Sequence, residues 1–188
     1  MSMPRSIASV PLLMLFALTL TTIAGTAHAA REVLDAEVNG ALEALYSKSP
    51  KAAELGQRAV GILVFPRIYK AGFVLGGAMG DGALRVEGQT VQYYRTTGVS
   101  FGLQLGAQVQ TQVLMFMQQD ALAKFRASEN WQAGVDGSVA LINIGAAKAV
   151  NTETDNSGEA IVGFIFDNQG LMGDLSFKGA KYWKIVAE

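Results

Sequence analysis

The sequence predicts an α+β fold in which N-terminal helices pack on a strongly curved, mostly antiparallel β-sheet that is punctuated by glycines and interrupted by one helix. Apolar residues recur at helical spacing only in residues 31–56 and 118–127. Elsewhere beyond Ala59 they form short runs or alternate with polar residues, as in strands. Most of the 21 glycines also fall beyond Ala59, where they favour turns and bends in a sheet.

The first 29 residues have the features of a secretory signal peptide. Arg5 is the only charged residue among them, residues 10–20 are almost all apolar, and Ala27-His28-Ala29 offers small residues around a cleavage point. The apolar segment is shorter than the about 20 residues of a transmembrane helix. We therefore expect residues 1–29 to be removed, with cleavage after Ala29 or Ala30, and residues 30–188 to form a single domain. An uncleaved membrane anchor is the alternative interpretation.

The composition excludes several classes of function. The chain has no Cys, and its one His, His28, lies in the predicted signal peptide. A mature chain without Cys or His has no thiol nucleophile, no Ser-His-Asp triad and no thiolate or imidazole metal site. Ser100 lies in a Gly-x-Ser-x-Gly pattern, but the chain offers no base to activate it. We therefore expect a non-enzymatic protein with no catalytic residue, no metal site and no cofactor.

Two helices are expected at the start of the mature chain. In residues 31–47, one apolar stripe is formed by residues three and four positions apart, while acidic residues occupy much of the remaining surface. The stripe consists of Leu34, Val38, Ala41, Leu42 and Leu45. A second, short helix is predicted after Ser49 as N-cap, with Pro50 in its first turn and an end near Gly56.

The strands are predicted from residue 59 onward. Residues 60–65 form an apolar run that Pro66 ends, and residues 71–79 and 83–87 are expected to form a hairpin whose turn is Gly80-Asp81-Gly82. The glycines of residues 76–82 match no phosphate-binding motif. Residues 89–96 form the next predicted strand.

The clearest element is a strict alternation over residues 100–113, with apolar residues on one face and mainly amides on the other. Because such a strand is longer than the usual 3–10 residues, we expect it to bend at Gly102 and Gly106. Residues 114–117 lose the alternation, which predicts burial on both faces.

The rest of the chain is predicted as a helix at residues 118–127, strands at 134–144, 159–166, 171–177 and 180–186, and a polar loop at 151–158. This loop fails as a calcium site because its twelfth position is Phe164 rather than Glu. Asp136 lies between small residues, and we expect it to accept backbone hydrogen bonds rather than to line a site.

Five basic residues fall within 23 positions, beside the apolar stripe of the first helix: Lys48, Lys51, Arg58, Arg67 and Lys70. Such a group can attract anionic lipid headgroups, and an ordinary solvated rim is the alternative. Lys+Arg number 15 against 16 Asp+Glu, so the chain has no basic excess for binding nucleic acid.

Several glycine-rich blocks resemble the SYLF domain family, in the family's order, over about residues 31–186. They are GILVFP at residues 61–66, KAGF at 70–73, GG at 76–77, GDG at 80–82, SFGLQLGAQ at 100–108, GVDGSVA at 134–140 and GLM at 170–172. The resemblance implies a non-enzymatic domain that binds lipid, phosphoinositides in the eukaryotic branch, through an amphipathic N-terminal helix and basic residues. The candidate lipid-binding residues here are Leu34, Val38, Leu42, Leu45, Lys51, Arg58, Arg67 and Lys70.

We expect a periplasmic or secreted protein, peripheral to a membrane, that binds phospholipid through an apolar surface or groove with a basic rim. The predicted signal peptide argues against actin as a partner. One alternative is a structural or partner-binding envelope protein that acts through protein contacts. A third is a small outer-membrane barrel, suggested by the long alternating segment.

Overall fold

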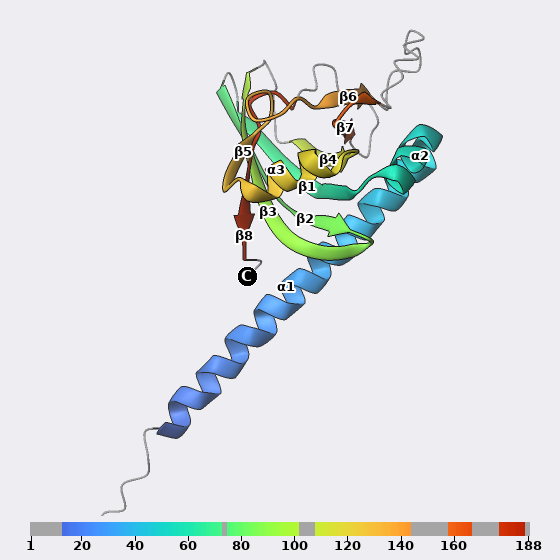
Figure 1. Cartoon of the computed structure of the whole chain (residues 1–188). Helices are drawn as coiled ribbons and strands as arrows, with labels where there is room; N and C mark the ends of the chain where they lie inside the picture. The colour runs from blue at the N-terminus through green and yellow to red at the C-terminus, as the bar shows by residue number, and fades with distance from the viewer. Residues whose placement is uncertain (1–12, 73–74, 102–107, 144–157, 167–176, 187–188) are drawn as a thin grey trace, which may run out of the picture.

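A computed structural model describes residues 13–72, 75–101, 108–143, 158–166 and 177–186. The fold is α+β, as predicted, and one sheet dominates it (Figure 1). The helices are α1 (Leu13–Lys48), α2 (Pro50–Arg58) and α3 (Gln119–Ala127). The strands are β1 (Gly61–Gly72), β2 (Leu75–Val86), β3 (Gln89–Phe101), β4 (Gln108–Phe116), β5 (Asn130–Gln132), β6 (Ala140–Asn143), β7 (Ile161–Phe166) and β8 (Lys181–Ile185).

The eight strands form one strongly curled sheet in the order β5-β8-β3-β2-β1-β4-β7-β6. Every described pair of neighbouring strands is antiparallel except β6 and β7. The curl brings distant strands together: the hydroxyl of Tyr182 on β8 lies 3.5 Å from Gln112 Oε1 on β4, although β3, β2 and β1 separate these two strands in the sheet. The face that carries these two side chains is therefore concave.

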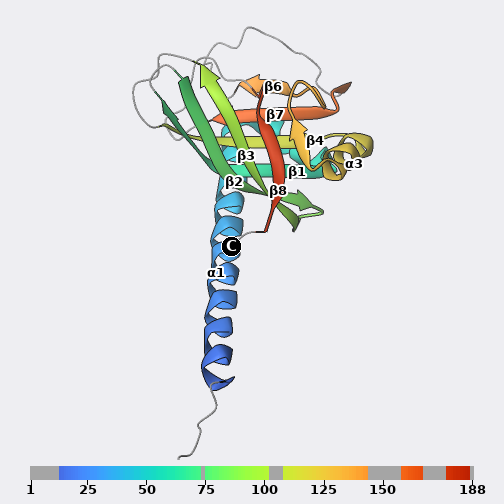
Figure 2. The same cartoon turned by 90° about the vertical axis from the view of Figure 1, so that its left-hand side faces the viewer.

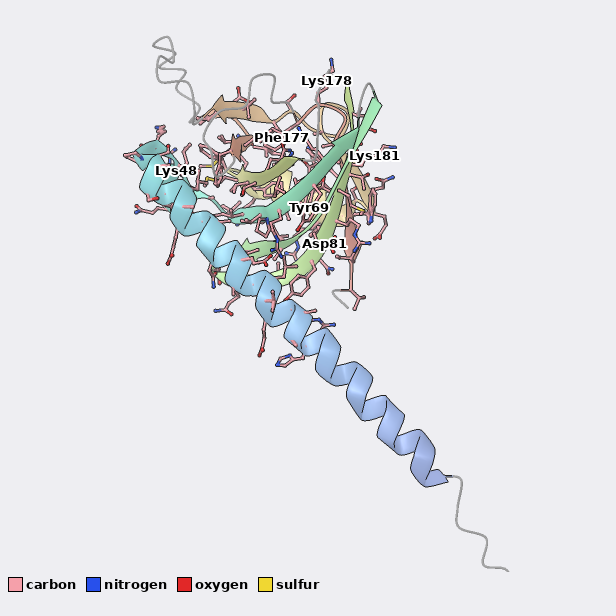
Figure 3. The ribbon with its side chains drawn as sticks, turned by 180° about the vertical axis from the view of Figure 1, so that it is seen from behind. Lys48, Tyr69, Asp81, Phe177, Lys178 and Lys181 are labelled. Carbon is pink, nitrogen blue, oxygen red and sulfur yellow. The ribbon has the colours of Figure 1, made fainter. Side chains whose placement is uncertain are left out.

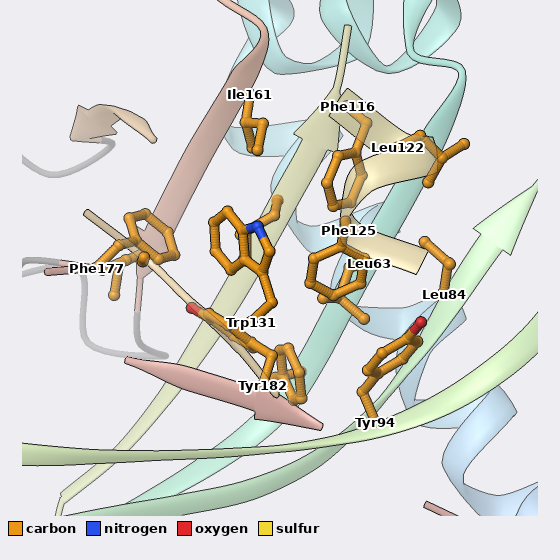
Figure 4. Close-up of a cluster of buried hydrophobic side chains, with 14 of the residues drawn as sticks. Leu63, Leu84, Tyr94, Phe116, Leu122, Phe125, Trp131, Ile161, Phe177 and Tyr182 are labelled. Carbon is orange, nitrogen blue, oxygen red and sulfur yellow. The ribbon is translucent and has the colours of Figure 1, made fainter. Parts of the chain in front are cut away.

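The concave face holds an aromatic core that α3 and β5 cover (Figure 4). Phe125 of α3 lies at its centre, with ring centroids 5.0 Å from Phe116 and Tyr94 and 5.4 Å from Trp131. Because α3 and Trp131 lie between the two sides of the curled sheet, the concave face is filled by side chains of the protein itself.

The convex face is covered by α1 and α2 only in part. Val38 and Leu45 of α1 and Leu55 of α2 are fully buried against β1, β4 and β7. The N-terminal part of α1 extends away from the sheet and contacts no strand along its first turns (Figures 1 and 2). On the other side of β1, α1 also contacts β2 and, through Asp35, the first half of β3.

The helices agree with the sequence analysis. Ser49 caps α2 by accepting a hydrogen bond of 3.1 Å from the backbone N–H of Ala52, and Pro50 occupies the first turn, as predicted. The α1 helix is longer than expected, because it continues without a break into the predicted signal peptide. Within the described part of the chain, no helix combines the length and the apolar character needed to cross a bilayer.

The predicted turn at Gly80-Asp81-Gly82 is wrong. These residues lie in the middle of β2, and the turn that follows β2 is formed by Glu87 and Gly88, which both have positive φ. Strand β1 likewise does not end at Pro66 but continues to Gly72, with a bulge between residues 64 and 69. The glycines of β2 serve this bulge: a Cβ on Gly80 would collide with the Arg67 carbonyl and one on Gly82 with the Val64 carbonyl. Their role is close strand packing rather than a turn.

The single long strand predicted at residues 100–113 is also wrong. Its first residues belong to β3 and its last to β4, and β2 and β1 separate these strands in the sheet. The predicted bends at Gly102 and Gly106 lie outside the described residues. The prediction for residues 114–117 is confirmed in its main point, since Leu114, Met115 and Phe116 are fully buried.

In the C-terminal region, the predicted helix and last strand are confirmed as α3 and β8. The strand predicted at 134–144 is shorter than expected, because only Ala140–Asn143 pairs with β7. Asp136 accepts a hydrogen bond of 2.6 Å from the backbone N–H of Gln132, which is the structural role expected for it. The strand predicted at 171–177 and the loop at 151–158 lie largely outside the described residues.

Candidate functional site

A groove of about 910 Å³ lies on the convex face, where α1 begins to leave the sheet. One wall is the middle of α1, from Ala29 to Glu37, and the other comes from β1, β2, β3 and the end of β8. We call it the convex groove, and it is lined by Ala29, Ala30, Val33, Leu34, Glu37, Pro66, Arg67, Tyr69, Met79, Gly80, Asp81, Arg95, Ile185 and Val186. Figure 3 shows Tyr69 and Asp81 beside α1 on this face.

Large apolar side chains are exposed at the convex groove. Val33 on α1 is 56% exposed, Tyr69 and Met79 on adjacent strands are 56% and 55% exposed, and Val186 after β8 is 76% exposed. Tyr69 pairs directly with Met79 in the sheet and, on its other side, with the exposed Val109 of β4. These side chains therefore form a continuous apolar band rather than single exposed residues. Contiguous exposed apolar surface of this kind marks a binding site for a ligand, a membrane or another protein.

Four charged side chains line the same groove as two ion pairs. Arg95 on β3 contacts Asp81 on β2 through two hydrogen bonds, Nε to Oδ1 at 2.6 Å and Nη2 to Oδ2 at 2.8 Å. Arg67 in the bulge of β1 pairs with Glu37 on α1. All four side chains keep contact with solvent, so the pairs are accessible to a ligand in the groove.

The acidic residues of α1 hold the helix on the sheet. Besides the pair of Glu37 with Arg67, Asp35 Oδ1 accepts a hydrogen bond of 2.7 Å from the hydroxyl of Thr90 at the start of β3. Arg85 on β2 donates to Asn39 Oδ1 at 3.0 Å and lies 3.5 Å from Asp35 Oδ1. These contacts fix the part of α1 that forms the wall of the groove.

The apolar stripe expected to contact lipid lies against the sheet. Val38 and Leu45 are fully buried, and Leu34 and Leu42 are partly buried against the same core. Of the four, only Leu34 lines the convex groove. In this conformation the stripe therefore supplies the packing of α1. The apolar side chains open to a ligand are Val33, which lies on α1 outside the stripe, and residues of the strands and the segment after β8.

The expected basic residues do not gather at one place. Lys51 and Arg58 lie on α2, where both contact Glu54, at the far end of α1 from the groove (Figure 1). Lys70 lies near the end of β1 and does not line the groove. Only Arg67 of the candidates is in the groove, and its charge is matched by Glu37.

The sequence analysis missed most of the groove's side chains, namely Tyr69, Met79, Asp81, Arg95 and Ile185 with its neighbour Val186. The first five lie on strands, on the face opposite to the aromatic core, and Val186 follows β8. The signal that could have found them is alternation within β2, where Met79 and Asp81 alternate with Gly80 and Gly82. Because the sequence analysis placed a turn at these glycines, it did not treat residues 79–82 as one alternating strand.

No cluster of His, Cys, Asp or Glu suited to a metal ion occurs among the residues that the structure describes. The largest pKa shifts are those of two tyrosines. Burial raises the pKa of Tyr94 to about 12, and it raises the pKa of Tyr182 further. Both tyrosines belong to the aromatic core. They lie on the face opposite to the groove and give it no acid or base.

Comparison with known proteins supports the resemblance seen in the sequence. The family model described as "Ysc84: Las17-binding protein actin regulator" matches residues 97–185, which run from the end of β3 to β8. No curated protein matches the chain significantly. The matched region contributes β4, α3, most of the aromatic core and the end of the groove at Ile185. Residues 97–185 thus match the Ysc84 (SYLF) domain family, a family of lipid-binding domains.

Proposed function

We propose that this protein binds phospholipid in the convex groove and that it acts without catalysing a reaction. The observation that carries the proposal is the apolar band of Val33, Tyr69, Met79 and Val186, which lies open beside two accessible ion pairs. An amphiphile needs both kinds of surface, one for its acyl chain and one for its headgroup. The groove volume also lies in the range of about 300–1,000 Å³ typical of sites for small ligands.

The free energy available from the apolar band is adequate for binding. Burying a side chain such as Val or Met completely is worth about 1.5–3 kcal/mol, so covering the exposed half of each contributes roughly 1 kcal/mol. Four such side chains on adjoining elements therefore supply several kcal/mol to an acyl chain that lies along them.

We further propose that the protein acts in the periplasm or outside the cell, after removal of residues 1–29. The proposal is supported by Val38, which lies well beyond the proposed cleavage point and is the first fully buried residue of α1 among those whose burial the structure describes. Cleavage after Ala29 leaves Leu34, Asp35 and Glu37 in place, and with them the contacts that hold the helix. The N-terminus of the secreted protein, read by mass spectrometry, tests this: a chain that starts at Met1 contradicts it.

Flotation with phospholipid vesicles tests the lipid-binding proposal. We expect the full chain to float with vesicles, and the double variant Tyr69→Ser/Met79→Ser to bind about tenfold more weakly, because it removes the centre of the apolar band. Val91→Ser is the matched control, since Val91 is an exposed apolar residue of β3 that does not line the groove. Every variant keeps the same N-terminal segment, so a difference between them reports the groove alone.

Two results contradict the proposal: no flotation of the parent chain with any vesicle, or equal loss in the groove and control variants. If the groove variants instead change self-association in sedimentation while lipid has no effect, the protein acts through protein contacts. That result favours a structural or partner-binding role in the cell envelope.

A further inference from the structure

The charged side chains of the convex groove indicate which lipid headgroup it takes. Glu37, Arg67, Asp81 and Arg95 are its only charged lining residues among those the structure describes, and their formal charges sum to zero. No lysine lines it. A purely anionic headgroup would therefore meet as many carboxylates as guanidinium groups.

The two pairs lie next to each other. Asp81 and Arg95 are direct partners across β2 and β3, and the backbone of Arg67 is packed against Gly80, the residue before Asp81. The bulge in β1 thus brings the backbone of Arg67 close to the residue that precedes Asp81, and the side chains of Arg67 and Asp81 line the same groove. The side chain of Arg67 is 53% exposed and that of Asp81 is 39% exposed, so both can meet a ligand from the groove.

From this arrangement we infer that the groove selects a zwitterionic phospholipid with a phosphoethanolamine headgroup. The phosphate receives hydrogen bonds from Arg67, whose planar guanidinium carries five N–H donors and suits phosphate geometry. The ammonium group, joined to the phosphate by a two-carbon bridge, donates to Asp81. The acyl chain then lies along Tyr69 and Met79, which border both charged residues.

A primary ammonium fits better than a quaternary one. A carboxylate is a hydrogen-bond acceptor, and a quaternary ammonium has no N–H to donate to it. Quaternary ammonium groups are instead bound by cages of several aromatic rings, and Tyr69 is the one aromatic residue that lines the groove. The inference rests on the proposed function, because it concerns the headgroup of the same lipid.

The test uses the full chain and monomeric short-chain lipids, dihexanoyl phosphatidylethanolamine and dihexanoyl phosphatidylglycerol, in equilibrium binding measurements. Monomeric lipids avoid partitioning of the N-terminal segment into a bilayer. We expect the parent chain to bind the ethanolamine lipid about fivefold more tightly than the glycerol lipid, the size expected for one accessible charge pair. Asp81→Asn should abolish this preference, and Arg67→Gln should weaken the binding of both lipids.

Lys124→Gln is the control, because Lys124 is an exposed residue of α3, outside the groove, and should alter neither affinity. Glu37→Gln offers a second carboxylate variant should Asp81→Asn fail to fold, as checked by circular dichroism, and it should reduce the preference as well. The inference is overturned if the glycerol lipid binds as tightly as the ethanolamine lipid, or if both carboxylate variants keep the preference. Binding of either lipid that is lost in Tyr69→Ser/Met79→Ser still upholds the proposed function, whereas no binding of either lipid overturns both.

Discussion

The hydroxyl of Tyr93 on β3 donates a hydrogen bond of 3.1 Å to Asp35 Oδ2 on α1, across 58 positions of sequence. The other oxygen of the same carboxylate accepts from Thr90, so Asp35 joins the helix to two points of one strand. Burial, and then the hydrogen bond with Asp35, raise the pKa of Tyr93. Two acidic residues of the first helix, Asp35 and Glu37, therefore serve as contacts with the sheet.

Asp35→Ala should lower the free energy of unfolding by about 1–3 kcal/mol, because it leaves Thr90 and Tyr93 without their acceptor. Urea unfolding measures the change. Glu43→Ala is the matched control, since Glu43 is an exposed acid of the same helix, and it should change stability by less than about 0.5 kcal/mol. Equal effects of the two substitutions would show that Asp35 does not hold the helix.

Tyr94→Phe should keep or raise the stability of the protein. Tyr94 is 1% exposed, and its hydroxyl has no hydrogen-bond partner among the described residues. Removing an unsatisfied buried hydroxyl relieves part of a desolvation cost of about 1–3 kcal/mol. Tyr182→Phe is the comparison, because Tyr182 is equally buried but its hydroxyl bonds with Thr96 and Gln112, and this variant should lose about 1 kcal/mol. Thermal unfolding of both variants measures the two changes. A larger loss of stability in Tyr94→Phe than in Tyr182→Phe would contradict the prediction.

Stability should fall in alkaline solution above pH 10. A tyrosine in the unfolded chain ionises near pH 10, whereas burial raises the pKa of Tyr94 to about 12 and that of Tyr182 further. The folded state therefore binds more protons than the unfolded state over this interval. The stabilisation from each tyrosine is complete below pH 10 and is lost as the pH rises through the folded pKa. Urea unfolding as a function of pH measures the loss.

The variant Tyr94→Phe is the control for the loss of stability in alkaline solution. The variant lacks one of the two groups, so its loss of stability between about pH 10 and 12 should be smaller by roughly 2–3 kcal/mol. Identical pH profiles for the variant and the parent chain would rule out Tyr94 as a source of the loss.

Gly80→Ala should destabilise the protein by about 1–3 kcal/mol or more, because the added Cβ would meet the backbone of Arg67 and Ile68. Gly77→Ala on the same strand is the control, since a Cβ there meets no atom within 4 Å, and it should be neutral or slightly stabilising. Urea unfolding compares the two. If both alanines are tolerated alike, the close approach of β1 and β2 at the bulge is not required by the fold.

The fold class was accessible from the sequence because helix and strand periods are local properties. Ser49 and Pro50 mark the start of α2, and the apolar residues from Leu114 to Phe116 mark a strand buried on both faces, without knowledge of their neighbours. The path of the sheet was less accessible. Gly80 and Gly82 are compatible with a turn and equally with a strand that lies close to its neighbour. The bulge of β1 around Arg67, which the sequence does not reveal, requires the second arrangement.

The candidate site was predicted only in part, for a similar reason. An amphipathic helix presents the same stripe whether it meets a membrane or the protein's own sheet, and here Val38 and Leu45 meet the sheet. The groove instead combines Val33, Met79 and Val186, residues from elements far apart in the chain that sequence spacing does not connect. Arg67 was found because it is basic, but its partner Glu37 could be assigned only in three dimensions.

The two outermost strands of the sheet, β5 with three residues and β6 with four, are also its shortest described strands. A short edge strand presents few unpaired N–H and C=O groups to another chain, which is how β-proteins avoid edge-to-edge aggregation. The long strands β1, β2 and β3, by contrast, all lie inside the sheet with a neighbour on each side. The protein can therefore keep an apolar band exposed for a ligand without offering a strand edge on which fibrils could grow.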